Sequence, residues 1–266
     1  MGNDNKKTSL AIRIPVWVLA FLVIAFVFYF TVMSLISTSR KISEINDSYS
    51  FKQIEKTSID EKFFTDSTFV EMQKEKAFIQ SRIAMAETDS IGLTLNLRDS
   101  LALLEINGVV VHKTKISFMR ICKAFNKANS YAVASMLSSP LKIISDTATI
   151  KKIPLMVKMA PKDTSEFKPD AIPDTSSYEP VNYILEMNNG IRIFVYQQET
   201  EKSKDIYNQI LFDITDRTKN TIAALRKMAA FEVPEYRLYI KIRMPKDDAK
   251  IIYRAVPQKG LITVFW

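Results

Sequence analysis

Residues 236–265 read YRLYIKIRMPKDDAKIIYRAVPQKGLITVF, and they predict a strand, a short helix and a second strand. Polar and apolar side chains alternate along RLYIKIR (237–243), which is the period of a β-strand. We expect the first strand over Tyr236–Met244, a helix over Asp247–Tyr253 and the second strand over the apolar run Leu261–Phe265.

Two Asn-Gly pairs predict β-hairpins upstream of this unit. The pairs are Asn107-Gly108 and Asn189-Gly190, and each separates two strand-like runs. Because both central residues of a type I′ turn need positive φ, Asn-Gly between such runs is a strong hairpin signal. The flanking runs are Leu101–Ile106, Val109–Val111, Asn182–Met187 and Ile191–Gln197.

The other segments complete a β-rich pattern with a few helices. Helices are expected over 60–86, Phe118–Leu137 and 202–231, and strands over Ile91–Leu97, Leu141–Ser145 and Leu155–Val157. The segment Ala160–Pro180 holds four prolines and few apolar residues, so it predicts a long loop. Because no βαβ repeat is present, we predict a β-rich α+β domain and not a doubly wound nucleotide-binding fold.

An apolar run precedes this domain. Pro15–Ile36 reads PVWVLAFLVIAFVFYFTVMSLI and contains no charged residue. A helix of this length spans roughly 33 Å, which is enough for a hydrocarbon core of roughly 30 Å. We therefore expect a single transmembrane helix in the lipid bilayer. Its marker residues are Pro15, Trp17, Phe21, Phe28 and Ile36, with Trp17 placed as an interfacial aromatic.

The expected anchor divides the chain into four parts. Residues 1–14 form a short polar N-terminus, 15–36 the transmembrane helix, 37–87 a juxtamembrane linker and stalk helix, and 88–266 the α+β domain. A cleaved signal peptide with its cleavage site at Ser37-Thr38-Ser39 is the rival interpretation, but its apolar region is usually only about 7–15 residues long. Basic residues flank the run on both sides, so charge does not set its orientation.

The composition excludes several kinds of site. Cys122 is the only cysteine and His112 the only histidine, which excludes an intramolecular disulfide, most transition-metal sites and most histidine-based catalysis. We expect no metal and no cofactor, because no carboxylate loop with calcium-binding spacing is present. Half of the net charge of +8 comes from residues 1–41, and no basic run is interleaved with aromatics, so no nucleic-acid partner is expected.

The stretch from Ile242 to Pro257 resembles the end of L,D-transpeptidase catalytic domains. In that family the sequence runs S-H-G-C-I-R-L/M-P-x-x-D-A-x-x-L-Y, followed by V-P-x-G-T-x-V. The matching residues here are Ile242-Arg243-Met244-Pro245, Asp248-Ala249, Tyr253 and Val256-Pro257, with Gly260 and Val264 after one extra residue. The hairpin from Leu93 to Ile116 and the segment Asn182–Val195 resemble earlier strands of the family. The resemblance covers about residues 90–265 and implies a β-rich L,D-transpeptidase-like fold.

The catalytic residues of that family have no counterpart at the matching positions. The family's reaction needs a cysteine thiolate and a histidine base. With the motifs aligned, the nucleophile position is Lys241, the preceding S-H-G positions are Leu238, Tyr239 and Ile240, and the upstream histidine position is Phe194. The resemblance thus implies a degenerate pocket of Phe194, Tyr239, Lys241 and Arg243. A shared fold would place Phe194 beside Lys241 and pair Arg243 with a carboxylate.

Simpler interpretations exist for the remaining chemically active side chains. Lys241 is either a desolvated catalytic lysine or one of the solvated residues on a polar strand face, the second being the usual case. Cys122 is expected as a buried core residue on a helix, and His112 as a surface or strand-end histidine. Both are expected to lie far from the matching motif.

Three functional hypotheses follow from these patterns. The resemblance implies a non-catalytic L,D-transpeptidase-like domain, anchored in the inner (cytoplasmic) membrane with its C-terminal domain in the periplasm. Its expected partner is peptidoglycan or an envelope protein, contacted through the Ala160–Pro180 loop. The alternatives are a membrane-tethered scaffold of unrelated α+β fold and an enzyme of unrecognised type.

Overall fold

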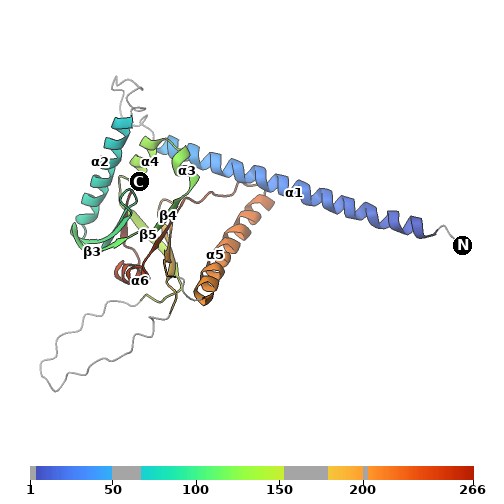
Figure 1. The fold of residues 1–266 in the computed structure, drawn as a ribbon. Coiled ribbons are helices and arrows are strands. Elements are labelled where there is room, and N and C mark those ends of the chain that lie inside the picture. The colour runs from blue at the N-terminus through green and yellow to red at the C-terminus, as the bar shows by residue number, and fades with distance from the viewer. Residues whose placement is uncertain (1–3, 50–66, 153–178, 200–202) are drawn as a thin grey trace, which may run out of the picture. The chain divides into compact units, whose positions relative to one another are not determined.

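The computed structural model describes residues 4–49, 67–152, 179–199 and 203–266. These residues form helices and one large mixed sheet, so the predicted α+β class is confirmed (Figure 1). The chain divides into two compact units, Met1–Ser43 with Arg217–Tyr236, and Glu44–Asp216 with Arg237–Trp266. The second unit contains the whole sheet. The predicted strand Leu155–Val157 lies outside the described residues, as does nearly all of the predicted loop.

Within the described ranges, nine strands form the sheet in the order β3-β2-β1-β9-β5-β6-β7-β8-β4. The pairs β1–β9 and β7–β8 are parallel, and all other neighbours are antiparallel. The strands are β1 (Gly92–Asn96), β2 (Leu101–Ile106), β3 (Val109–Lys115), β4 (Phe118–Ile121), β5 (Leu141–Ala148), β6 (Asn182–Met187), β7 (Arg192–Gln197), β8 (Tyr239–Met244) and β9 (Leu261–Phe265). Every residue of β7 is buried, so both faces of that strand are covered.

The predicted strand–helix–strand unit is present as β8, α6 (Lys246–Ala255) and β9. Pro245 occupies the N-cap of α6, where its missing N–H costs no helical hydrogen bond. Ala249, Ile252 and Tyr253 are buried, and their i, i+3, i+4 spacing turns one face of α6 toward the sheet, where the helix packs against β7. α6 thereby connects β8 near one edge to β9 in the middle of the sheet.

The predicted helix Phe118–Leu137 is wrong over its first residues. Phe118–Ile121 is strand β4, and the helices that follow are α3 (Lys123–Lys127) and α4 (Ser130–Leu137). β4 pairs antiparallel with β8, and this distant partner overrides the local preference for helix. α4 begins where Asn129 accepts a hydrogen bond from the N–H of Tyr131 at 2.9 Å, a side-chain N-cap.

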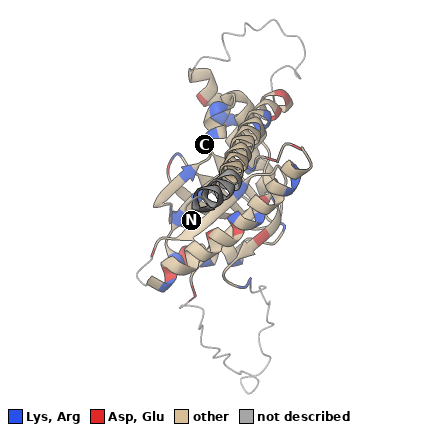
Figure 2. Cartoon of the chain, turned by 90° about the vertical axis from the view of Figure 1, so that its right-hand side faces the viewer, with Lys and Arg blue, Asp and Glu red and all other residues tan. Residues whose placement is uncertain are grey.

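Three longer helices complete the described structure. α2 (Ser67–Ala86) packs on α4 and β9 through Ala77, Ser81 and Met85, two of them small enough for close approach. α1 (Asp4–Ser48) runs through the predicted anchor and is long and apolar enough to cross a membrane. α5 (Ser203–Ala229) matches the helix predicted over 202–231 and carries basic and acidic residues along its length (Figure 2).

The two Asn-Gly pairs form different turns. Asn107 and Gly108 both have positive φ, 49° and 79°, so the predicted type I′ turn is confirmed between β2 and β3. Of the pair at 189–190, only Gly190 has positive φ, at 79°. Its N–H donates to the carbonyl of Met187 at 2.9 Å, and Met187 N–H donates to Ile191 at 2.8 Å. This is a three-residue loop with Gly190 in the left-handed position, so the type I′ prediction is wrong there.

Both hairpins should depend on their glycines. Gly190→Val should lower the free energy of unfolding by about 1–2 kcal/mol, because a branched side chain is strained at positive φ even where no atom crowds it. Gly190→Asn should cost less, since Asn tolerates this conformation. Urea denaturation of the full chain in detergent measures both effects. Equal losses from Val and Asn would show that backbone strain is not what Gly190 relieves.

Candidate functional site

The parallel pair β7–β8 brings together two of the residues singled out from the sequence. Phe194 lies directly opposite Lys241 in the register, and the Nζ of Lys241 is 4.6 Å from the centroid of the Phe194 ring. The rings of Tyr196 and Tyr239 lie 5.5 and 6.0 Å from the same nitrogen. An ammonium at these distances is attracted by the negative faces of aromatic rings. Three aromatic side chains therefore surround the amino group of Lys241.

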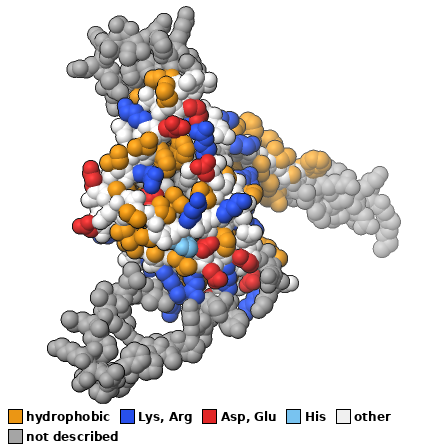
Figure 3. Space-filling model, turned by 60° about the vertical axis from the view of Figure 1, so that its left-hand side comes forward, with side chains coloured by type: hydrophobic (Ala, Val, Ile, Leu, Met, Phe, Trp, Pro, Cys, Tyr) orange, Lys and Arg blue, Asp and Glu red, His pale blue; other side chains and the backbone are white. Residues whose placement is uncertain are grey.

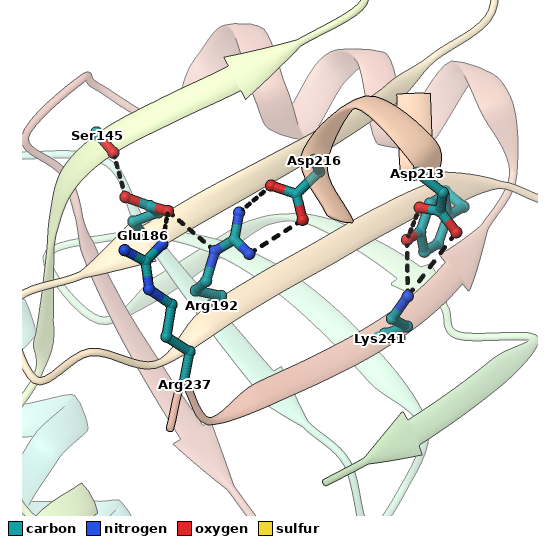
Figure 4. A network of polar contacts seen from close by, with 8 residues as sticks. Ser145, Glu186, Arg192, Asp213, Asp216, Arg237 and Lys241 are labelled. Atoms are coloured by element: carbon teal, nitrogen blue, oxygen red, sulfur yellow. Dashed lines mark hydrogen bonds and ion pairs between the residues drawn. The ribbon is translucent and has the colours of Figure 1, made fainter. Parts of the chain in front are cut away.

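Helix α5 covers this cluster of side chains. Asp213 accepts a hydrogen bond from the hydroxyl of Tyr196 at 2.6 Å and lies 3.9 Å from the Nζ of Lys241. Lys241 also donates to the Tyr196 hydroxyl at 3.2 Å (Figure 4). The ammonium is thus both a hydrogen-bond donor and an ion-pair partner, with only 21% of its side chain exposed. The prediction of a solvated polar face is wrong at Lys241.

A second ion-pair group lies beside the first on the same helix and strands. Arg192 of β7, 7% exposed, pairs with Asp216 of α5 through both terminal nitrogens. Its Nε lies 2.9 Å from Glu186 of β6, which also accepts a hydrogen bond from Ser145 at 2.8 Å (Figure 4). Arg237 approaches Glu186 at 3.4 Å. Charges from α5, β6 and β7 therefore neutralise one another beneath the helix.

Apolar and aromatic side chains also pack between α5 and the sheet. Ile184, Phe194 and Tyr196 form a buried cluster on the sheet, and Phe212 of α5 and Tyr239 pack against it. The elements that hold the predicted pocket residues therefore form a filled interface between sheet and helix. The signal that sequence reasoning missed is the acidic pair Asp213 and Asp216, three residues apart and hence on one side of α5.

Two other predicted positions lie apart from this cluster. Arg243 has no carboxylate partner among the described residues, so the expected pairing is not observed. Cys122 is fully buried, as expected, but it lies at the N-cap of α3 and not within a helix. Its N–H donates to the carbonyl of Tyr239 at 3.0 Å, so its backbone lies closer to the motif than predicted.

His112 lies beside a residue of the matching motif. Its Nε2 is 3.0 Å from Asp248 of α6, and Thr114 donates to the other carboxylate oxygen at 2.6 Å. Figure 3 shows the histidine beside acidic side chains on this face of the molecule. The half-buried histidine thus ties strand β3 to the first turn of α6, a structural role beyond that of the surface residue we expected.

Tyr253, also part of the motif, holds α6 against strands β5 and β6. Its hydroxyl donates to Asp146 at 2.7 Å, and its ring lies 4.9 Å from that of Tyr183. Burial, followed by the carboxylate of Asp146, raises the pKa of Tyr253 above its usual range. Burial also raises the pKa of Tyr183 and lowers that of Lys152, whose Nζ lies 4.9 Å from the Tyr253 ring centroid. Both tyrosines stay neutral near pH 7, which fits a packing role.

Comparison with profiles of protein families, with curated proteins and with solved structures finds no match to this chain.

The ion pair beneath α5 should contribute measurably to stability. Asp216→Asn should lower the free energy of unfolding by about 1–3 kcal/mol, because it removes the carboxylate that faces the buried Arg192 charge. Glu75→Gln is the matched control, since its pair with Arg98 at 3.5 Å is over half exposed on both sides. That change should cost less than about 0.5 kcal/mol. Equal effects in chemical denaturation would contradict the structural role of Asp216.

Proposed function

We propose that this chain is a membrane-anchored, non-catalytic L,D-transpeptidase-like domain that acts in binding or scaffolding at a bacterial cell envelope. The observation that carries the proposal is the pairing of Phe194 with Lys241 across β7 and β8. These residues stand where the resembled family has its histidine and its cysteine. A scaffold of unrelated fold would have no reason to place them together, although they lie 47 positions apart in the numbering.

The environment of the motif residues supports the same relationship. β8, α6 and β9 occur in the order that the motif implies. The residues that match the motif make contacts that hold this unit together. Asp248 is bound by His112 and Thr114, and Tyr253 by Asp146. Gly260 closes the turn before β9 by donating to the carbonyl of Pro257 at 3.0 Å. The residues that match the motif therefore stabilise the strand–helix–strand unit.

The filled interface favours binding over catalysis. A transpeptidase needs an accessible thiolate and a base beside it. Here a lysine and a phenylalanine occupy those positions, and Asp213 and Phe212 of α5 cover them. Cys122 is fully buried. In this proposal, other surfaces make the contact with peptidoglycan or an envelope protein. One candidate is the segment Ala160–Pro180, which lies almost wholly outside the described residues.

The proposed location follows from α1. Its apolar side chains from Trp17 onward are mostly exposed, which suits lipid better than water. We place this helix in the inner membrane, with the sheet-containing unit in the periplasm. The resemblance to an envelope family supports this orientation.

The wild-type chain should not be acylated by carbapenems, which react with the cysteine nucleophile of L,D-transpeptidases. The expected intact mass after incubation is unchanged, because the sole thiol, Cys122, is buried. An active L,D-transpeptidase under the same conditions is the positive control. A covalent adduct mapped to Cys122 would overturn the non-catalytic assignment.

Restoring both residues of the catalytic pair should restore thiolate character. In a Cys122→Ala background, Lys241→Cys alone should give a thiol with a pKa above the free value of about 8.5, because aromatic side chains and Asp213 surround that position. Adding Phe194→His should lower that pKa, because the register places the imidazole beside the thiol and His⁺ stabilises a thiolate. The pH dependence of alkylation by iodoacetamide measures the shift.

Tyr239→Cys with Phe194→His is the matched control for this experiment. Tyr239 lies on the same face of β8, but its register partner is Arg192. Its thiol should show a smaller shift than the one introduced at 241. Identical pH profiles for the two double variants would remove the structural basis of the proposed relationship.

A further inference from the structure

The segment between α5 and β8 runs along α1 within the first compact unit. The hydroxyl of Tyr29 donates to the carbonyl of Met228 at 2.9 Å, and Ser37 donates to the carbonyl of Pro234 at 2.6 Å. The rings of Tyr29 and Phe231 meet edge to face, 6.4 Å apart. Met228, Pro234 and Ser37 are buried. Residues 228–234 are therefore held against α1 between Tyr29 and Ser37.

These contacts determine which part of the apolar run of α1 lies beside residues 228–234. Tyr29 belongs to the run Pro15–Ile36, and from Tyr29 to Ile36 the helix rises roughly 10 Å. An amphipathic element at an interface buries its apolar face by about 5–10 Å into the boundary between headgroups and acyl chains. If the run Pro15–Ile36 spans the bilayer, Phe231 lies at the depth of this boundary.

Phe231 has an unusual backbone and an unusual exposure. It ends α5 with φ of 58°, the position that glycine usually takes in this type of helix end. The N–H of Phe231 donates to Met228 at 3.0 Å, and that of Glu232 donates to Lys227 at 2.9 Å, which is the Schellman hydrogen-bond pattern. A bulky residue is disfavoured there. The residue is nonetheless 84% exposed, and the apolar residues of α1 from Trp17 to Phe28 are exposed as well.

The last turn of α5 has the charge that suits a lipid surface. Arg226 and Lys227 are exposed, immediately before the buried Met228. Basic side chains beside an inserted aromatic are attracted to anionic headgroups, and their long stems let the charge reach the headgroup layer. Apolar ring and basic side chains together are typical of a membrane-surface element.

We propose that residues 226–234 form a second membrane contact, in which Phe231 inserts into the interface of the same bilayer that α1 crosses. The occupant of this surface is lipid, because the exposed ring continues the apolar surface of α1. Arg226 and Lys227 bind anionic headgroups around it. This inference rests on the proposed membrane anchoring. Beyond the anchoring itself, the inference determines how α1 is rotated about its own axis. The side of α1 that carries Tyr29 and Ser37 faces residues 228–234 and not bulk lipid.

Site-specific fluorescence quenching in vesicles tests the proposal. The full chain with Cys122→Ala and Phe231→Cys is labelled with an NBD fluorophore and reconstituted into vesicles of phosphatidylcholine and phosphatidylglycerol in equal parts. Phe231 is exposed, so its replacement should not unfold the protein. We expect lipids with a nitroxide near the headgroup to quench this label several-fold more than a label at Phe118→Cys, the matched control, which is 53% exposed on β4.

A third label, at Phe21→Cys within the apolar run of α1, separates the two proposals. If nitroxides deep in the acyl chains quench this label, the anchor is in place. If the labels at 231 and 118 are then quenched equally by headgroup nitroxides, the second contact is overturned. No quenching at Phe21→Cys would overturn the anchor, and the second contact with it. A label at 231 that is shielded from aqueous iodide but untouched by lipid nitroxides would show that protein covers this surface, which also overturns the proposal.

Discussion

The guanidinium of Arg192 lies almost fully buried on β7, between β6 and β8. Removing such a charge from water costs several kcal/mol unless opposite charges and hydrogen bonds replace the lost hydration. Glu186 and Asp216 supply them, and Asp216 belongs to α5. Without α5, Arg192 would lose Asp216 and keep Glu186 as its carboxylate partner. The same helix packs Phe212 against the aromatic cluster and places Asp213 beside Lys241.

The same helix keeps water away from the pair Phe194 and Lys241. Cysteine and histidine at a reactive site need solvent access and a substrate channel, whereas lysine and phenylalanine stacked against each other gain from exclusion of water. Asp213 gives Lys241 a partner, and Tyr196 connects the two. In the proposed relationship to L,D-transpeptidases, the cover that stabilises this pair would also exclude a substrate.

Signals contained within about ten residues predicted much of the fold, and signals that depend on distant partners did not. The alternation in 237–243 and the Asn107-Gly108 turn need only local backbone preferences, and both predictions agree with the structure. β4 was missed because its strand conformation depends on pairing with β8, more than a hundred residues later. The cover over the candidate site was missed for a similar reason. Asp213 and Asp216 read as ordinary surface acids of a helix until Arg192 and Lys241 are placed opposite them.

Strand β9 follows all the other strands in the sequence, yet it lies between β1 and β5 in the middle of the sheet. Among the described residues, the half-sheet β3-β2-β1 is joined to the other strands through β9 alone, and β5 pairs with β9 through Leu141 and Lys142. During synthesis, both half-sheets must therefore wait with an open inner edge until residues 261–265 emerge. Unpaired edges of this kind are prone to association with other chains. The order of elements thus makes closure of the sheet a late step of synthesis.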